Sequence, residues 1–401
     1  MGTETIPVDL PYLNNLLQRV LESPALSIRE WSAQPLQGGL ELGSAIYRVR
    51  GLAEQSGSEL AWSLILKVIR PDPEQADPQG YRYWRREPDA YQSGHLHQLP
   101  APVTAPRCYD VCQQADGSLW LWLEDIQEDQ PAEWSIEQYA QVARGLGRFN
   151  GAFLAGKAEL SDAWLVHDWL RRYVEHAAPM VAFIRQNPAH PAVKSLLPGA
   201  TLALSLAMWD ERQRMERMLD RQPQSFCHQD AFRRNLFRRG QELVAIDWGY
   251  AGMAPVGAEL APLIGVAFGL AGFPSNRAKE LDQACFEGYL QGLEEVGWNP
   301  DRGQVRLGYV LTVLLRYVMG GTMGELLPGV LEESTRQRWA DGLGKTTEKV
   351  AETDAGIAAY YQSITFEAMQ RLGLGAILRL VVRTVFYSIR LRQVSAARQS
   401  G

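Results

Sequence analysis

Residues 227–249 of this chain read Cys-His-Gln-Asp-Ala-Phe-Arg-Arg-Asn-Leu-Phe-Arg-Arg-Gly-Gln-Glu-Leu-Val-Ala-Ile-Asp-Trp-Gly. The pattern predicts a loop, a short strand, a turn at Gly240 and a second strand that ends at Asp247. Such a hairpin would bring Asp230, Asn235 and Asp247 together. Asp230 can receive the proton of an acceptor hydroxyl, while Asn235 and Asp247 offer the hard oxygen ligands that Mg²⁺ prefers. These are the polar groups that phosphoryl transfer requires, because that reaction depends on positioning and charge compensation.

The spacing of these residues resembles a known family. His228-x-Asp230, four residues and Asn235, followed twelve residues later by Asp247 in Ile-Asp-Trp, is similar to the aminoglycoside phosphotransferase and choline kinase branch of the kinase-like fold. In that family the histidine braces the catalytic loop and takes no part in the chemistry. The alternative is that Asp230 is a turn or N-cap aspartate and Asp247 a strand-end carboxylate.

The resemblance implies an α+β, bilobal protein-kinase-like fold. Residues 1–126 would form a leader helix and a β-rich nucleotide-binding lobe. Residues 127–401 would form a helical C-lobe that carries the catalytic hairpin, residues 227–249, and the acceptor site. ATP and Mg²⁺ would bind in the cleft. The pattern after Ser135-x-x-Gln138, which reads as a capping box, has the spacing of a long helix.

A single lysine lies in a mostly apolar candidate strand at residues 61–69. Lys67 is similar to the third-strand lysine that pairs with the α- and β-phosphates; a snorkelling lysine on an edge strand is the alternative. Glu87 resembles the helix glutamate that anchors this lysine. The next residue, Pro88, is compatible only if Glu87 lies in the first turn of its helix, where a missing N–H costs nothing.

Two further segments are candidates for nucleotide contact. Residues 37–44 contain three glycines, and their backbone N–H groups together with Ser44 would cover the phosphates, although an ordinary hairpin turn has the same composition. The strand that ends in Leu-Glu124-Asp-Ile126 resembles the hinge between lobes. There the adenine meets backbone donors and acceptors, so Glu124 and Ile126 are assigned to nucleotide binding.

The chain departs from the family pattern near the catalytic loop. Gln229 stands where glycine is usual, and Ala231 where leucine is usual. Arg233 and Arg234 precede the amide ligand; one of them would reach the γ-phosphate, or both would be solvated. Glu259 stands where the family often has an aspartate and would take over its structural place. No departure removes the base or a magnesium ligand, so a dead pseudokinase is not expected.

Composition limits the other possibilities. With 401 residues, 46% hydrophobic and 21% charged, the chain is an ordinary globular sequence. Its net charge of -6 and pI near 5.7 argue against nucleic-acid binding. Four cysteines without a CxxC pair indicate reduced thiols in a cytoplasm, and no signal peptide begins the chain. The longest uncharged run, residues 260–276, is broken by prolines and glycines, so no membrane span is expected.

Two segments have a competing interpretation. Residues 342–346 end like a Walker A loop, but Trp339 occupies the place of its first glycine and no strand precedes it. The tail of residues 376–392 carries four arginines beside apolar residues at helical spacing. We expect this helix to pack on the lobe with its arginines toward solvent; a position on a membrane surface is the alternative.

The sequence therefore predicts an ATP- and Mg²⁺-dependent kinase that phosphorylates a hydroxyl of a small molecule. No Asp-Phe-Gly to Ala-Pro-Glu activation segment follows the hairpin, which argues against protein substrates. The acceptor is left open between an aminoglycoside, a macrolide, an amino alcohol such as choline and a sugar, and the oligomeric state is not determined. For a polycationic acceptor, carboxylates near the base are required. The candidates are Glu259, Glu325, Glu332 and Glu333. The competing class is a non-catalytic nucleotide-binding regulatory module on the same scaffold.

Overall fold

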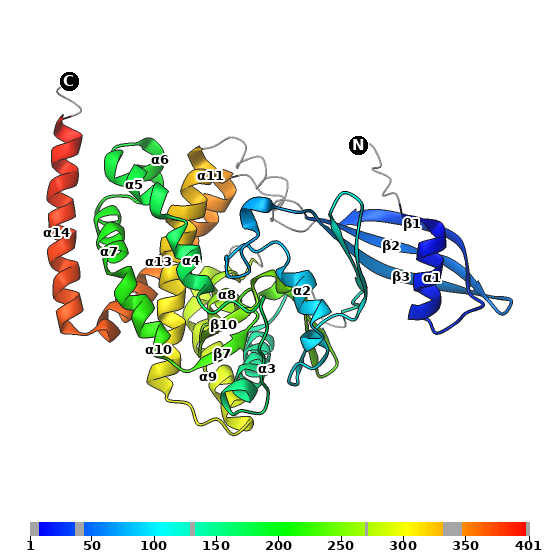
Figure 1. Cartoon of the computed structure of the whole chain (residues 1–401). Coiled ribbons are helices and arrows are strands. Elements are labelled where there is room, and N and C mark those ends of the chain that lie inside the picture. The colour runs from blue at the N-terminus through cyan, green and yellow to red at the C-terminus, as the bar shows by residue number, and fades with distance from the viewer. Residues whose placement is uncertain (1–7, 37–43, 129–132, 269–271, 332–346, 398–401) are drawn as a thin grey trace.

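The computed structural model describes residues 8–36, 44–128, 133–268, 272–331 and 347–397. A β-rich lobe forms the N-terminal part and a helical lobe the C-terminal part (Figure 1), so the predicted α+β bilobal architecture is confirmed. The glycine-rich residues 37–43 and the Walker-like residues 342–346 lie outside the described residues.

The N-terminal lobe is built on an antiparallel five-stranded sheet. Its spatial order is β1-β2-β3-β6-β5. The strands are β1 (Ser27–Leu36), β2 (Ser44–Gln55), β3 (Ser58–Ile69), β5 (Cys108–Gln113) and β6 (Leu119–Glu124). The strand predicted at residues 61–69 is present within β3. It begins earlier than predicted, at Ser58, because β2 and β3 stay paired up to the turn at residues 56 and 57.

The alternation along β3 separates two environments. Trp62, Leu64 and Leu66 pack with helix α1 (Leu10–Val20) on one face of the sheet. Ile65 and Ile69 point to the other face and contact the main core. Successive side chains of a strand alternate between faces, so Lys67 is carried to the second face, toward the C-terminal lobe.

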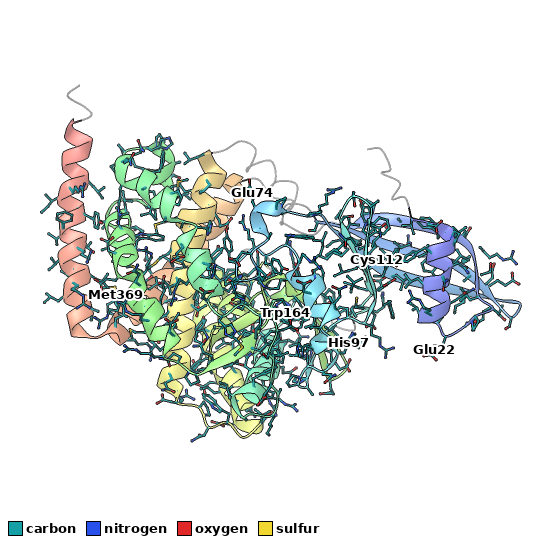
Figure 2. The ribbon with its side chains drawn as sticks, in the orientation of Figure 1. Glu22, Glu74, His97, Cys112, Trp164 and Met369 are labelled. Carbon is teal, nitrogen blue, oxygen red and sulfur yellow. The ribbon has the colours of Figure 1, made fainter. Side chains whose placement is uncertain are left out.

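Helix α2 (Arg86–Gln92) connects the sheet to the C-terminal lobe. Arg86 is fully buried and donates to the carbonyl oxygens of Trp164 (3.3 Å) and Gly249 (3.0 Å). Figure 2 places Trp164 in the interior beside this helix. A charged side chain that is bound to backbone carbonyls from two distant segments fixes α2, and with it Glu87, against the C-terminal lobe.

Two long helices of the C-terminal lobe pack closely against each other, α3 (Ile136–Leu154) and α9 (Ala278–Glu295). The predicted capping box begins α3, with Ser135 and Gln138 bonded reciprocally. Glycines permit close approach of the two backbones: a Cβ on Gly147 would lie 2.2 Å from Tyr289 O, and one on Gly292 would lie 2.0 Å from Arg144 O.

The other helices complete the lobe. They are α4 (Trp169–Glu175), α5 (Ala178–Gln186), α6 (Pro191–Leu196), α7 (Ala200–Asp220), α8 (Leu260–Gly265), α10 (Arg302–Val313), a π-helical segment (Leu314–Leu326), α11 (Leu327–Leu331), α13 (Thr347–Leu372) and α14 (Leu374–Ala397). Within the described ranges one stretch, Arg302–Gly329, is long and apolar enough to span a membrane, and 61% of its apolar window is buried inside the lobe.

The C-terminal tail packs on the lobe as predicted, but two of its arginines do not simply face solvent. Arg379 and Arg383 of α14 form ion pairs with α7, while six apolar residues of the helix are at least half exposed. The acidic residues of α7, Asp210 and Glu211, account for this orientation, because they provide partners for arginines on a neighbouring helix.

Candidate active site

The predicted hairpin is present and joins the two lobes. Strand β8 (Leu236–Arg239) turns at Gly240, whose φ of 58° suits glycine, and pairs with β9 (Glu242–Ala245). On its other edge β9 pairs in parallel with β4 (Val103–Thr104), which follows α2 in the chain. The loop before β8 leaves strand β7 (Gln224–Cys227), which pairs with β10 (Gly252–Pro255).

Asp230, the predicted base, is held by two side chains. Asn235 donates its Nδ2–H to Asp230 Oδ2 at 2.9 Å. Arg316 donates from its NH2 to Asp230 Oδ1 at 2.9 Å. The preceding residue, Gln229, has a φ of 62°, in the left-handed region that is uncommon for residues other than glycine. Asp230 is therefore presented at a sharp turn, with its carboxylate oriented from both sides.

His228 braces the loop. Its Nδ1 accepts the backbone N–H of Asp230 (3.2 Å), so the ring proton is on Nε2, which donates to Ile246 O (2.9 Å). The ring thereby connects the loop to the end of β9. Burial lowers the pKa of His228 to about 4, so the imidazole is neutral at physiological pH.

Glu259 holds the same loop through hydrogen bonds to its backbone. This side chain is fully buried and accepts the backbone N–H groups of His228 (2.8 Å) and Gln229 (2.9 Å). Burial raises its pKa to about 7. Glu259 thus has the structural place predicted for it. It is not available to a polycationic acceptor, because both of its oxygens accept backbone hydrogen bonds inside the core.

Lys67 connects two carboxylates across the lobes. Its Nζ lies 2.5 Å from Glu87 Oε2 and 2.8 Å from Asp247 Oδ1. Burial opposes the positive charge, but Asp247 and Glu87 outweigh it, so the pKa of Lys67 is raised. Glu87 lies in the first turn of α2, where Pro88 is tolerated as predicted.

Asp247 follows β9 and adopts a left-handed conformation, with φ 65° and ψ 69°. Burial disfavours its charge, but the ammonium group of Lys67 outweighs burial and lowers the pKa of Asp247. Ile246 N donates to Asn235 O (2.9 Å), so Asp247 and Asn235 project from adjacent points of the backbone.

This pair fits a magnesium ion by its donor chemistry. The Asn235 amide must direct its nitrogen to Asp230, which only accepts, so the amide oxygen is the atom available to a metal. Among the described residues, no cluster of three or more His, Cys, Asp or Glu side chains forms a complete metal cage. Mg²⁺ commonly binds one or two protein oxygens together with substrate phosphates and water, which matches this set.

The remaining predicted residues lie at the edges of the site. Ser44 begins β2, opposite Ile69 in the register. Glu124 ends β6, and its side chain pairs with Arg239 (2.7 Å). Glu124 and Ile126 would therefore contact a nucleotide only through their backbone atoms.

Arg233 is not solvated. It pairs with Glu128 (2.8 Å) and lies 4.5 Å from the ring centre of Trp134. Arg234 is exposed. Of the two arginines, the buried one therefore has a structural role in fixing the segment after the hinge.

Sequence reasoning missed Arg316. It lies in the π-helical segment, is 7% exposed, stacks over the Trp169 ring at 4.8 Å and also donates to Gln229 O. Its position 86 residues after Asp230 gives no motif that would reveal the pairing. A lone arginine in an apolar stretch, next to Tyr317, was the available signal, because a buried arginine requires a partner.

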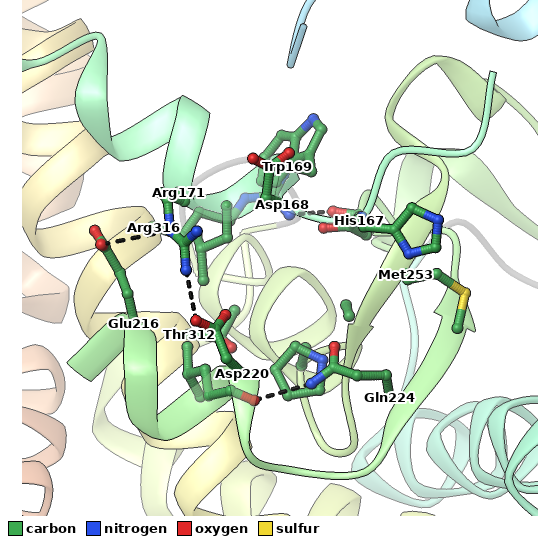
Figure 3. A pocket seen from close by; sticks show the side chains of 16 residues that line it. His167, Asp168, Trp169, Arg171, Glu216, Asp220, Gln224, Met253, Thr312 and Arg316 are labelled. Atoms are coloured by element: carbon green, nitrogen blue, oxygen red, sulfur yellow. Dashed lines mark hydrogen bonds and ion pairs between the residues drawn. The ribbon is translucent and has the colours of Figure 1, made fainter. Parts of the chain in front are cut away.

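A small pocket lies beside the loop, between α4, α7 and β10 (Figure 3). Gln229 of the catalytic loop and Arg316 of the π-helical segment are among its lining residues. Arg171, Glu216 and Asp220 line it from α4 and α7. Its volume is about 50 Å³, which is enough for water molecules and too small for a hydroxylated acceptor. The acceptor is therefore not assigned to this pocket.

Comparison with known proteins identifies the family. The model of the phosphotransferase enzyme family matches residues 49–307. This match covers more than half of the chain, so the chain belongs to that family and is a small-molecule kinase. No curated protein matches the chain.

Several solved structures are similar. Aminoglycoside phosphotransferase APH(3'')-Id from Streptomyces rimosus is 20% identical, with 77% of this chain and 99% of that chain covered and a TM-score of 0.41. Amicoumacin kinase hAmiN is 15% identical, with 87% and 93% covered and a TM-score of 0.49. An aminoglycoside phosphotransferase from Alicyclobacillus acidocaldarius is 15% identical, with 92% and 98% covered and a TM-score of 0.48.

Proposed function

We propose that this kinase transfers the γ-phosphoryl group of ATP to a hydroxyl of a small molecule, with Mg²⁺ held by Asn235 and Asp247. The observation that carries the proposal is the connected set Glu87–Lys67–Asp247, which faces the Asn235–Asp230 pair across one hairpin. The bound ion would compensate charge on the phosphates. An intact set of this kind favours turnover over the alternative of a non-catalytic module.

Each side chain would have a separate task. Lys67 would exchange its contact with Asp247 for phosphate oxygens, while Glu87 keeps the ammonium group in place. Asp230 would accept the proton of the acceptor hydroxyl at the carboxylate and orient the attacking oxygen. His228 and Glu259 would hold the loop rigid, so that this oxygen is delivered in line with the phosphoryl group.

The surroundings of the base favour a neutral acceptor over a polycation. Of the four candidate carboxylates, Glu259 is buried and Glu325 lies 3.0 Å from Arg82 NH2 and 3.3 Å from His176 Nε2. The other two, Glu332 and Glu333, lie outside the described residues. The charge of Asp230 itself is compensated by Arg316, so the base offers little attraction to an ammonium group.

ATP consumption over a panel of acceptors tests the proposal. A thermal shift with ATP that increases with Mg²⁺ is expected first, because a ligand that binds only the folded state stabilises it. ADP formation is then measured with aminoglycosides, macrolides, amino alcohols and neutral sugars, with the Asp230→Asn variant as control. Nucleotide binding without turnover on any acceptor would support the regulatory module, and preferential turnover of aminoglycosides would contradict the neutral acceptor.

A further inference from the structure

Helix α14 has one face fixed on the C-terminal lobe. Leu380 and Tyr387 are buried, and the Tyr387 hydroxyl donates to Asp210 Oδ2 on α7 at 2.8 Å. Arg383 lies 2.8 Å from the same carboxylate. Arg379 lies 3.2 Å from Glu211. These polar contacts determine the rotation of the helix about its axis, so its opposite face is turned away from α7.

The outward face is apolar. Figure 1 shows α14 at the outer edge of the lobe, with α7 and α13 on one side of it. Six apolar side chains of the helix are at least half exposed: Leu378 (65%), Val381 (50%), Val382 (59%), Val385 (54%), Phe386 (55%) and Ile389 (54%). A contiguous patch of this kind is uncommon on a monomer and marks a surface that is covered by a partner.

The spacing within this patch is that of a coiled coil. Four of its residues are separated by four, three and four positions, which corresponds to the d, a, d and a positions of a heptad repeat. We call these residues, Leu378, Val382, Val385 and Ile389, the α14 seam. Its a positions carry β-branched Val382 and Ile389, the type of residue found there in two-stranded coiled coils. The buried Leu380 and Tyr387 fall at f positions, on the far side of the helix.

We propose that the α14 seam is the docking surface for a second copy of this chain, which forms a homodimer by packing α14 against α14. A twofold axis places the same patch on both copies, so a self-complementary heptad seam suits it. Complete burial of the six side chains would remove roughly 600 Å² per copy, or about 1,200 Å² in total, which reaches the lower end of specific interfaces.

Charge disfavours a membrane as the occupant. Helices that lie on membranes carry free basic residues on the polar face. In the described part of α14, Arg379 and Arg383 are already paired with Asp210 and Glu211, which leaves Arg390 as the one exposed arginine with no such pair. The chain has a net charge of -6, which anionic lipids repel. A second copy of the chain would bury the apolar face of α14 without needing Arg379 or Arg383 for binding.

The mass of the full chain in solution tests this inference, independently of the phosphotransfer reaction. Light scattering after size exclusion should give about twice 44.9 kDa at micromolar concentrations. Val385→Arg and Leu378→Glu should each shift the mass to that of a monomer, with an unchanged circular dichroism spectrum. Both side chains are exposed, so neither substitution disturbs the core.

Phe366→Arg is the matched control. Phe366 is 62% exposed on α13 and does not belong to the seam, so the dimer should persist in this variant. A wild-type monomer at every concentration would overturn the inference, as would dissociation by Phe366→Arg to the same extent. Flotation with phosphatidylcholine–phosphatidylglycerol vesicles tests the membrane alternative. If the wild type is monomeric and floats with the vesicles, and Val385→Arg does not, the α14 seam binds lipid and the inference is overturned.

Discussion

Arg316 NH2 lies 2.9 Å from Asp230 Oδ1, and the same guanidinium donates to the carbonyl oxygen of Gln229. One arginine thus holds both the side chain of the proposed base and the backbone of the turn that presents it. The guanidinium stacks on the ring of Trp169, and this contact limits the movement of the arginine side chain. The orientation of the base therefore depends on the π-helical segment, which lies outside the catalytic hairpin.

Replacement of Arg316 should reduce both stability and turnover. We expect Arg316→Gln to lower the free energy of unfolding by about 3–5 kcal/mol, because it removes the charged partner of a largely buried carboxylate. Arg316→Lys keeps the charge but not the fork that contacts two acceptors, so it should lose less stability while turnover still falls. Urea unfolding and ADP formation measure the two effects. Wild-type turnover in Arg316→Gln would contradict a positioning role.

Substitution of the base should separate chemistry from binding. We expect Asp230→Asn to lower kcat by about 10²–10⁴-fold while the Kd for ATP changes by no more than a few-fold, because the carboxylate acts on the acceptor proton. Calorimetry and ADP formation measure the two quantities. The control is Asp220→Asn, at an exposed ion pair with Arg171. A kcat within roughly threefold of the wild type would remove Asp230 from the base role.

Removal of Asp247 should abolish the effect of magnesium. In Asp247→Ala, ATP is expected to raise the unfolding temperature by the same amount with and without Mg²⁺, since one of two protein ligands is lost. A thermal-shift titration measures this difference. Asp77→Ala, which removes an exposed carboxylate paired with Arg172, should retain the magnesium effect. An unchanged magnesium effect in Asp247→Ala would place the ion elsewhere.

Loss of Lys67 should weaken ATP binding and leave a buried charge. Lys67→Met removes the cation next to Glu87, whose side chain is only 5% exposed, so stability should fall by about 3–5 kcal/mol. The double variant Lys67→Met/Glu87→Gln should recover part of that stability but none of the ATP affinity. Urea unfolding and calorimetry on the single and double variants test this. Equal ATP affinity in Lys67→Met and the wild type would refute the phosphate role.

The buried histidine should make stability depend on pH. The pKa of His228 is about 4 in the folded protein and near its ordinary 6.5 when unfolded, so between these values the unfolded state binds the extra proton. His228 therefore contributes fully to the free energy of unfolding above pH 6.5, and this contribution is lost as the pH falls toward 4.

Comparison with His228→Gln isolates this contribution. The difference in unfolding free energy between wild type and variant should shrink by up to about 1.4 kcal/mol per pH unit below pH 6.5. Urea unfolding at several pH values between 5 and 7.5 measures it. Glu259 titrates in both proteins, so the subtraction removes its opposite trend. A difference that does not vary with pH would show that folding leaves the pKa of His228 unshifted.

The sequence by itself determined the elements of this fold and most of the proposed site. Alternation along β3 located Lys67, and turn chemistry at Gly240 placed Asn235 and Asp247 on one hairpin, because both signals depend on neighbours in the chain. Tertiary structure alone decided the contacts between distant segments. Arg316 meets Asp230 only because the π-helical segment packs under the loop.

The direction in which α14 faces was likewise decided by the tertiary structure. Periodicity shows that a helix has an apolar face and a basic face, but not which of them the lobe will receive. Arg379 and Arg383 pair with the lobe because α7 presents Asp210 and Glu211 at that position, and six apolar residues are left exposed. The orientation of α14 therefore depends on ion pairs between residues that are more than 160 positions apart. A local sequence pattern carries no information about such pairs.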